Sequence, residues 1–302
     1  MQFGIREICD VVFKAKNAGT LGTMPYVAGQ PVLYIDTAKT STMEGAATTV
    51  YAQGGKGNAR LIAWEGERTL TFTVEDALLS ELGFAILSGA GLMNNTESGD
   101  TVYTHRTTIA EVVNGIIDLQ HVLADDGEII ADAAPVFAMV MENGSIVRTL
   151  TGLTVAEDGM SLTGCKEKNG VTVLVDYYVA KTSGVTEMTI DVENFAGYYY
   201  VEASTLFRRQ SDGKDLPAEL IFPNVKIQSN FTFTMAATGD PSTFTFTMDA
   251  MPGYTRFDRT KKVLCAMQVI DEDAAKAKGV DSTGTVADED LTYPVDETPK
   301  GE

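Results

Sequence analysis

Threonine alternates with large apolar residues in three separate stretches of the chain, residues 69–74, 231–235 and 243–248. Successive side chains of a β-strand point to opposite faces of the sheet, so each stretch predicts a strand with one apolar face and one face of hydroxyl groups. Such strands suit a sheet with one face in the core and the other against water or another subunit. The alternation predicts a mainly β protein, in which the second and third stretches pair as a hairpin through a turn at residues 239–242.

The first of these stretches belongs to a longer run of strand patterns. Residues 60–65 and 68–74 are rich in β-branched and aromatic residues, and the intervening Glu65-Gly66-Glu67 is short enough to be a hairpin turn. Residues 9–16 and 31–36 show further strand patterns nearer the start of the chain.

Two segments have apolar residues at helical spacings of three and four. The first, residues 78–87, follows Glu75 and Asp76, two acids that favour a helix N-terminus, and precedes the small residues 88–91, which suit a helix end. The second lies within residues 101–126, where the apolar residues group into a stripe. The pattern predicts a helix in each segment.

Residues 37–58 are small and polar, too many for a tight hairpin and without helical periodicity. The pattern predicts a projecting loop, and long loops in compact domains often carry function. Gly54-Gly55-Lys56-Gly57 raises the alternative of a phosphate-binding loop. That motif requires Ser or Thr after the lysine and a helix that begins there, and neither is indicated by this sequence.

The middle of the chain has the rhythm of a separate β-sandwich. Asn143-Gly144 is a turn signal between the strand patterns of residues 135–142 and 145–150. Short strand patterns follow at roughly ten-residue spacing, at residues 161–164, 171–180, 187–192 and 198–203. The predicted organisation is a first part of the main domain at 1–100, an inserted β-rich domain at 101–202, a second part at 203–270 and an acidic tail at 271–302.

The chain of 302 residues carries a net charge of −19, from 42 acidic against 23 basic residues. This balance argues against a groove that grips nucleic acid by neutralising phosphates. No window approaches eighteen apolar residues, and the start lacks the apolar region of a signal peptide, so we expect no membrane span and synthesis in a cytoplasm. The three cysteines, Cys9, Cys165 and Cys265, are expected to be reduced packing residues, with an inter-subunit disulfide as the alternative.

Residues for catalysis are sparse. His105 and His121 are the only histidines, and neither accompanies a nucleophile motif or a metal-ligand spacing. Residues 125–128, Asp-Asp-Gly-Glu, raise a calcium site as an alternative but lack the alternating ligands of a calcium loop. The tyrosines at 177–178 and 198–200 raise a sugar-binding platform, although neighbouring residues of a strand point to opposite faces. We assign no catalytic residue, cofactor or metal.

Two segments together resemble the tail tube (major tail) protein of a tailed bacteriophage, most closely those of contractile tails. They are AQGGKGNARLIAWEGERTLTFTVEDALLSELGFAILSGAG at residues 52–91 and FRRQSDGKDLPAELIFPNVKIQSNFTFTMAATGDPSTFTFTMDA at residues 207–250. The middle stretch is similar to an immunoglobulin-like insertion carried on the outside of some virion proteins. The resemblance implies a tail-tube-type β-sandwich or barrel with a packed α-helix, plus an inserted immunoglobulin-like β domain.

The resemblance also implies a role without enzymatic activity. Six copies would close into a ring, the rings would stack into a tube in the virion tail, and DNA would pass through without specific binding. The implied partners are other copies of the chain and a tail sheath or other tail proteins, and synthesis would occur in the bacterial host cytoplasm. A capsid or decoration protein and a carbohydrate-binding adhesin are the alternatives. The candidate lumen residues are Glu65, Glu67 and Asp249, and the candidate ring-stacking residues are Thr42, Met43, Glu44, Tyr51 and Lys56.

Overall fold

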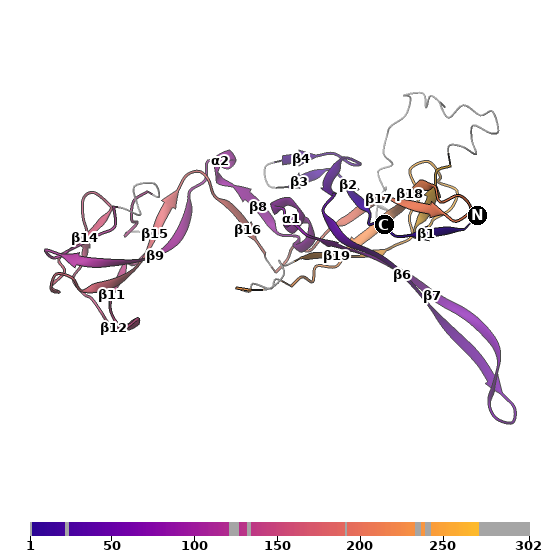
Figure 1. The fold of residues 1–302 in the computed structure, drawn as a ribbon, viewed down its shortest axis with the longest axis horizontal. Helices are drawn as coiled ribbons and strands as arrows, with labels where there is room; N and C mark the ends of the chain where they lie inside the picture. The colour runs from indigo at the N-terminus through magenta and orange to yellow at the C-terminus, as the bar shows by residue number, and fades with distance from the viewer. Residues whose placement is uncertain are drawn as a thin grey trace, which may run out of the picture. The chain divides into compact units, whose positions relative to one another are not determined.

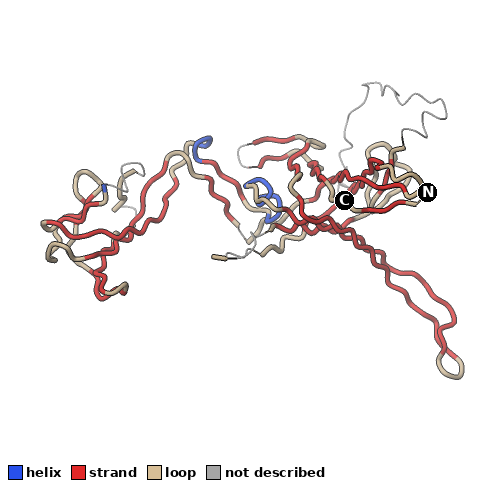
Figure 2. Tube along the Cα trace, viewed as in Figure 1, coloured by secondary structure: helices blue, strands red, loops and turns tan. Residues whose placement is uncertain are grey.

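A computed structural model describes residues 2–21, 24–120, 127–131, 134–190, 192–232, 237–238 and 243–271. Strands predominate throughout this part of the chain, and its two helices are short (Figure 2). The mainly β class predicted from the sequence is confirmed. The acidic tail predicted at residues 271–302 lies outside the described residues except for Asp271.

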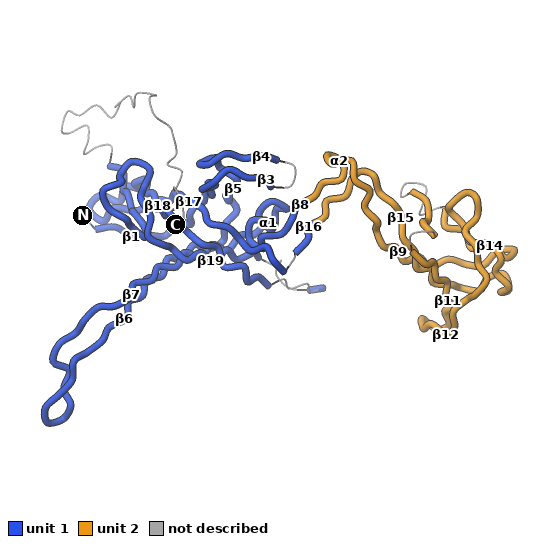
Figure 3. The backbone as a smooth tube through the Cα atoms, turned by 180° about the vertical axis from the view of Figure 1, so that it is seen from behind, with its two compact units in different colours: residues 1–92, 188–302 blue, residues 93–187 orange. Residues whose placement is uncertain are grey.

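The chain divides into two compact units (Figure 3). Unit 1 combines residues 1–92 with residues 188–302, and unit 2 consists of residues 93–187. In the sequence, unit 2 is therefore an insertion into unit 1. Strands β8 (Gly91–Asn94) and β16 (Thr186–Thr189), which lie where the chain passes from one unit to the other, pair as a two-stranded sheet.

Unit 1 is organised around a nine-stranded antiparallel sheet (Figure 1). The main path runs β5-β2-β17-β18-β19-β7-β6, with β1 paired to β17 and β20 paired to β18. The bounds are β1 (Phe3–Ile5), β2 (Asp10–Ala15), β5 (Pro31–Ile35), β6 (Ala38–Gly54), β7 (Ala59–Asp76), β17 (Tyr198–Arg209), β18 (Asp215–Ile227), β19 (Phe244–Ala250) and β20 (Ala266–Val269). Strands β3 (Gly19–Leu21) and β4 (Met24–Tyr26) form a separate pair. The strand patterns predicted at residues 9–16 and 31–36 are confirmed as β2 and β5.

The core of unit 1 takes alternate residues from these strands. Phe72 of β7 stacks on Phe222 of β18 with 4.8 Å between ring centroids, and both side chains are buried. In β19 the phenylalanines and the methionine are buried, whereas Thr245 is exposed. The apolar face predicted from the threonine alternation is therefore the core face of the sheet.

The predicted hairpin of residues 228–248 is confirmed only in its second strand. That strand is β19, which pairs with β7 and β18. Phe231 and Thr232 are not in a strand, and residues 233–236 and 239–242, with the predicted turn, lie outside the described residues. The Phe231 ring packs instead against Phe84 of the helix α1 (Glu81–Ser88), with 5.3 Å between centroids.

Helix α1 confirms the first predicted helix but begins later than expected. Ser80 caps it, since its hydroxyl accepts a hydrogen bond of 2.9 Å from the Gly83 amide. Gly89 ends it at φ 72°, in the left-handed region that glycine tolerates. Glu75 and Asp76, predicted at the helix N-terminus, belong to strand β7, where Asp76 accepts a hydrogen bond from Thr37 at 2.5 Å.

Unit 2 holds a seven-stranded sheet in the order β12-β11-β15-β9-β10-β14-β13. The bounds are β9 (Val102–Val113), β10 (Ile116–Asp118), β11 (Phe137–Glu142), β12 (Ser145–Thr149), β13 (Thr154–Val155), β14 (Ser161–Thr163) and β15 (Thr172–Lys181), with the short helix α2 at Asn95–Ser98. The Asn143-Gly144 hairpin is confirmed, and both residues have positive φ, as the tight turn requires.

The helix predicted within residues 101–126 is wrong. Residues 102–113 form strand β9, which pairs with β15 over ten residues. Val102, Ala110 and Val112 are buried at even spacings, so the period is two. Asn114-Gly115, with φ of 53° and 78°, turns the chain into β10, and this turn signal identifies the hairpin in the sequence.

Candidate functional site

Strands β6 and β7 form a long hairpin that leaves the sheet of unit 1 as a two-stranded ribbon (Figures 1 and 2). Their pairing runs from Ala38↔Asp76 at the base to Gly54↔Ala59 at the tip. Strand β19 pairs with β7 only between Thr71 and Asp76. Beyond this stretch β6 is the only strand paired with β7 among the described residues. We call the ribbon of residues 45–70 the arm.

The loop predicted at residues 37–58 is therefore wrong as secondary structure, because most of the segment is strand β6. Its small polar residues have weak strand propensity, but their pairing with β7 stabilises the strand in spite of it. The turn predicted at Glu65-Gly66-Glu67 is also wrong. Gly66 and Glu67 lie opposite the single residue Thr48, which makes a β-bulge within one continuous strand.

The true turn is at residues 55–58. Gly55, Gly57 and Asn58 have positive φ values of 80°, 85° and 50°, and the Asn58 amide donates a 3.2 Å hydrogen bond to the Gly55 carbonyl. Lys56 lies in this turn, between two strands. The segment leads into strand β7 and not into a helix, so its geometry does not fit a phosphate-binding loop.

One face of the arm is apolar and open to solvent. Val50 lies opposite Trp64, and Ala52 lies opposite Ile62 two positions along, so these four side chains share a face. Val50, Ile62 and Trp64 are 64%, 56% and 53% exposed. A two-stranded ribbon of this kind is marginally stable alone, and contiguous exposed apolar side chains mark an interaction surface.

The opposite face of the arm is polar. It carries Thr49 opposite Glu65, Tyr51 opposite Ala63, and Gln53 opposite Arg60. The Arg60 guanidinium lies over the Tyr51 ring, 4.1 Å from the centroid, a cation–π contact within the arm. The arm is thus amphipathic, with an apolar face that its own unit leaves uncovered.

The ring-stacking candidates fall on two parts of the hairpin. Thr42, Met43 and Glu44 lie at its base, opposite Thr73, Phe72 and Thr71. Tyr51 lies on the polar face of the arm, about 30 Å from Thr42 at the rise of a strand, and Lys56 lies in the tip. The structure therefore spreads these residues along strand β6 and the tip of the hairpin, and the sequence alone did not single out the exposed apolar residues Val50, Ile62 and Trp64. Their period of two, which the small residues around them obscure, was the available signal.

The lumen candidates do not come together either. Asp249 lies in β19, where its carboxylate accepts hydrogen bonds of 3.0 and 3.1 Å from Gln228 and one of 3.4 Å from Thr71. Glu65 and Glu67 are exposed on the arm. Glu65 is six residues from Thr71 along β7, or about 20 Å. The acids thus occupy two levels of unit 1.

No group of three or more His, Cys, Asp or Glu side chains in the described residues is placed to hold a metal ion. His105 lies 2.6 Å from Asp176 in an exposed pair of unit 2, while His121 and two residues of the calcium alternative, Asp125 and Asp126, lie outside the description. Cys9 and Cys165 are buried free thiols and Cys265 is a half-buried one. Burial raises the pKa of Cys9, and it raises that of Cys265 to about 11.

The tyrosine runs divide their rings between two faces, as the strand geometry predicts. Tyr177 is fully buried and its hydroxyl lies 3.0 Å from that of Thr108, whereas Tyr178 is partly exposed beside His105. The neighbouring rings do not form one platform. Within the described ranges, no helix has the length and apolar character needed to cross a membrane.

The fold and the arm define a mainly β protein with an exposed apolar surface on a two-stranded ribbon. A model of the YomU/Tube protein family matches residues 3–262. The match covers most of the chain, so the chain belongs to the YomU/Tube protein family. This membership supports a tube-like structural protein of phage origin. A search of curated proteins found no match.

Proposed function

We propose that the chain is the repeating subunit of a phage tail tube, in which six copies close into a ring and the rings stack into a hollow channel for DNA. The observation that carries this proposal is the uncovered apolar face of the arm, with Val50, Ile62 and Trp64 exposed in a chain of a tube family. Another copy of the chain is the partner that a repeating assembly supplies.

Burial of the apolar side chains of the arm against another copy would stabilise the stacking of rings. Fully burying an exposed large apolar side chain contributes about 1.5–3 kcal/mol, and Val50, Ile62 and Trp64 are partly exposed, so covering them contributes part of this amount toward the cost of association. In a hexamer the contact repeats around the ring, and each contact formed raises the effective concentration of the next. Thr42, Met43 and Glu44 at the base and Lys56 at the tip are assigned to the same ring-to-ring contact, which Tyr51 joins from the opposite face of the arm.

Acids account for transit of DNA without binding. We assign Glu65, Glu67 and Asp249 to the channel wall, where their carboxylates repel phosphates and lack the attraction that lysine or arginine would add. The net charge of −19 supports a wall of this sign. None of the described strands of unit 2 joins the sheet of unit 1, and we assign to unit 2 the contacts with a sheath or other proteins of the virion tail, as in a contractile tail.

Electron microscopy of the purified protein tests the proposal. The wild type is expected to form hollow stacked rings, with sixfold symmetry, above a threshold concentration. The double variant Ile62→Ser, Trp64→Ser should keep its circular dichroism spectrum and fail to stack, because the apolar face is lost. Ala63→Ser, on the polar face of the same ribbon, is the matched control and should form tubes.

Two outcomes would contradict the proposal. One is a wild type that remains monomeric at every concentration, also with a tail initiator added. The other is a double variant that forms tubes at the threshold concentration of the wild type.

A further inference from the structure

Unit 1 has a basic groove at the root of the arm. The groove has a volume of about 640 Å³ and lies where residues 261–265 meet the part of the ribbon nearest the sheet, on β6 and β7. Its charged lining residues are Arg68, Lys261 and Lys262, and no Asp or Glu occurs among the lining residues that the structure describes. With the exception of Thr69, the other lining residues are small or apolar. The groove therefore suits an apolar ligand that also attracts cations.

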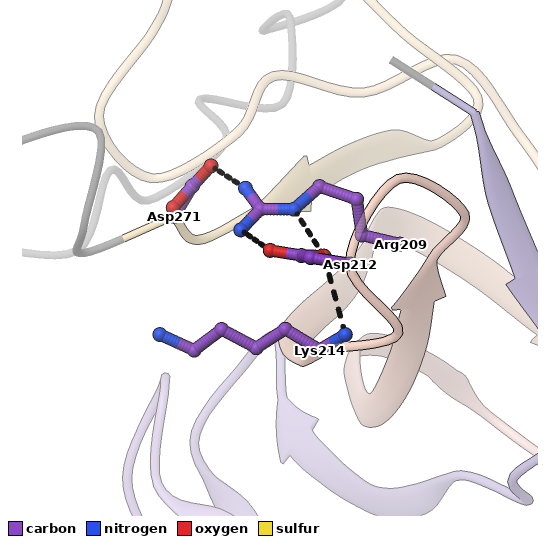
Figure 4. Close-up of polar contacts among 4 residues, drawn as sticks. All are labelled: Arg209, Asp212, Lys214 and Asp271. Atoms are coloured by element: carbon purple, nitrogen blue, oxygen red, sulfur yellow. Dashed lines mark hydrogen bonds and ion pairs between the residues drawn. The ribbon is translucent and has the colours of Figure 1, made fainter.

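The wall of the groove, residues 261–265, is held from two sides. Within it, Val263 and Gly253 exchange backbone hydrogen bonds of 2.8 and 3.1 Å. Directly after it, strand β20 pairs with β18. Beyond β20, the Asp271 carboxylate forms an ion pair of 2.5 Å with Arg209 of β17 (Figure 4). The groove is therefore a built feature of unit 1.

The groove and the apolar face of the arm lie on opposite faces of one ribbon. Ala47 and its partner Arg68 line the groove, whereas Val50 and its partner Trp64 belong to the apolar face. Val50 is three positions beyond Ala47 on β6, and an odd step along a strand leads to the opposite face. Trp64 is four positions from Arg68 on β7, because the bulge at Gly66 adds one residue to that strand. One hairpin thus presents an apolar surface on one side and a groove on the other.

The arm does not place its own Trp64 in the groove. Trp64 is paired with Val50 in a register that continues to the groove itself, so reaching the groove would require the ribbon to separate into single strands. Trp64 is the only tryptophan of the chain and is 53% exposed. An arm that enters the groove therefore comes from a second copy of the chain.

The apolar face of the arm matches the groove in charge and in shape. The face of an indole ring is the negative part of its quadrupole, and it attracts ammonium and guanidinium groups within about 6 Å of the ring centroid. The same kind of contact occurs within the arm, where the Arg60 guanidinium lies 4.1 Å from the centroid of the Tyr51 ring. The three cations of the groove complement the Trp64 ring, and its small residues leave room for the side chains beside that ring.

A contact of the arm with this groove would be head-to-tail. The two copies contribute different surfaces, so the copy that gives its arm still offers its groove, and the copy that receives the arm still offers its own arm. Such a contact repeats along a stack and does not end at a dimer.

We propose that the groove at the root of the arm receives Trp64, with Ile62 and Val50, from the arm of a second copy of the chain. This inference rests on the proposed stacking of rings and adds the surface that accepts the arm. The indole ring lies against the cations of the groove, and the neighbouring apolar side chains cover its small and apolar residues.

Photo-crosslinking of the full chain tests the proposal. Ile62 is replaced by p-benzoylphenylalanine, which keeps the face apolar and leaves Trp64 in place, in an equal mixture of unlabelled and ¹⁵N-labelled protein. Cross-linked peptides are identified by mass spectrometry. We expect mixed-isotope products that join position 62 to residues 45–47 or 261–265. The same replacement at Ala63, on the opposite face of the arm, is the control and should give several-fold less of these products.

A filled groove provides a second comparison. Ala47→Phe places a ring in the groove and should reduce the mixed-isotope products several-fold. Thr49→Phe, two positions further along the same face of β6, is not among the lining residues and should leave the products unchanged. Both variants should keep the circular dichroism spectrum of the wild type.

Electron microscopy of the same samples separates this inference from the proposed function. Tubes whose mixed-isotope products lie outside the groove would overturn the docking site and leave the tube standing, whereas groove products without tubes would support the docking site and contradict the tube. Absence of mixed-isotope products, or products that Ala47→Phe leaves unchanged, would overturn the docking site. Duplex DNA binding by the wild type that Lys261→Ala with Lys262→Ala abolishes would identify nucleic acid as the occupant and would overturn it as well.

Discussion

The two ends of the β6–β7 hairpin have similar strand patterns but differ in the burial of their apolar side chains. At the base, Phe72 and Val74 are 1% and 0% exposed, because β19 and the core of unit 1 lie against them. On the arm, Ile62 and Trp64 lie on the same strand β7 and are more than half exposed. The difference is in the neighbours and not in the residue types, since both ends carry large apolar side chains.

In the proposed tube, this difference separates the folding of the subunit from its assembly. Apolar side chains at the base stabilise unit 1, whereas those on the arm contribute little until a partner covers them. The boundary lies between Gly66 and Thr71, because the bulge at Gly66 and the end of the β19 pairing at Thr71 delimit this stretch. Substitutions on the two sides of this boundary should therefore have different effects.

The largest expected effect on folding comes from the base. Phe72→Ala removes a buried ring that stacks on Phe222 and should lower the free energy of unfolding by about 3–5 kcal/mol. Urea denaturation followed by circular dichroism measures the loss. Trp64→Ala on the arm, a comparably large truncation, should change the stability of the free subunit by less than about 0.5 kcal/mol. Equal losses for the two variants would remove the distinction between base and arm.

A substitution at the Gly66 bulge, between the two ends, should have an effect of intermediate size. A Cβ added at Gly66 would lie 2.5 Å from the Thr48 hydroxyl oxygen, closer than side chains approach each other. Gly66→Val should therefore shift the ribbon locally and cost about 1–3 kcal/mol in assembly, measured as a rise of the threshold concentration for tubes. Gly45→Ala on β6, where the nearest atom would be 3.6 Å away, is the control. An unchanged threshold for Gly66→Val would show that the bulge does not set the course of the arm.

The sequence predicts much of unit 1 where local pattern and tertiary context agree. The alternation of Phe244, Phe246 and Met248 with threonine predicts strand β19, and all three side chains are buried. Ser88 and Gly89 predict the end of helix α1 because glycine tolerates the left-handed backbone there. In these places each residue favours the structure that its neighbours also favour.

The sequence fails where pairing partners outweigh local preference. The small polar residues of β6 form a strand because β7 pairs with them from Ala38 to Gly54. The local sequence pattern does not show this pairing. Gly66 lies in a bulge, and a sequence pattern alone does not separate a bulge from a turn. In unit 2, β-branched residues at helical spacings misled the prediction, although Asn114-Gly115 marks a hairpin.

The projection of residues 37–58 was predicted, but its secondary structure was not. The segment of residues 37–58 projects from unit 1, as expected, and carries the stacking candidates. The exposure of Ile62 and Trp64 depends on where the sheet stops, a property of the fold as a whole. A sequence with apolar residues at a period of two predicts a buried strand face, and only the structure shows that this face is uncovered.

The smallest expected effect concerns the charges on the two sides of the boundary. At the base, Glu75 accepts hydrogen bonds from Thr243 at 2.5 Å and Thr40 at 3.1 Å, and these bonds lower its pKa below its ordinary value of 4.5. On the arm, Glu65 has an exposed pairing with Arg68 at 3.7 Å, which contributes little. The lowered pKa means that Glu75 stabilises unit 1 above about pH 4.5 and that this contribution is lost as the pH falls further.

Denaturant unfolding from neutral to acid pH measures this contribution. Glu75→Gln should be less stable than the wild type at neutral pH, and the gap should close as the pH falls below 4.5, because protonation removes the negative charge that the two hydroxyl groups solvate. Glu65→Gln is the matched control on the arm and should show a smaller gap at neutral pH, since its carboxylate forms only the weak pair with Arg68. A gap for Glu75→Gln that is the same at every pH would mean that the hydroxyl contacts act through packing, and the base would then differ from the arm in burial alone.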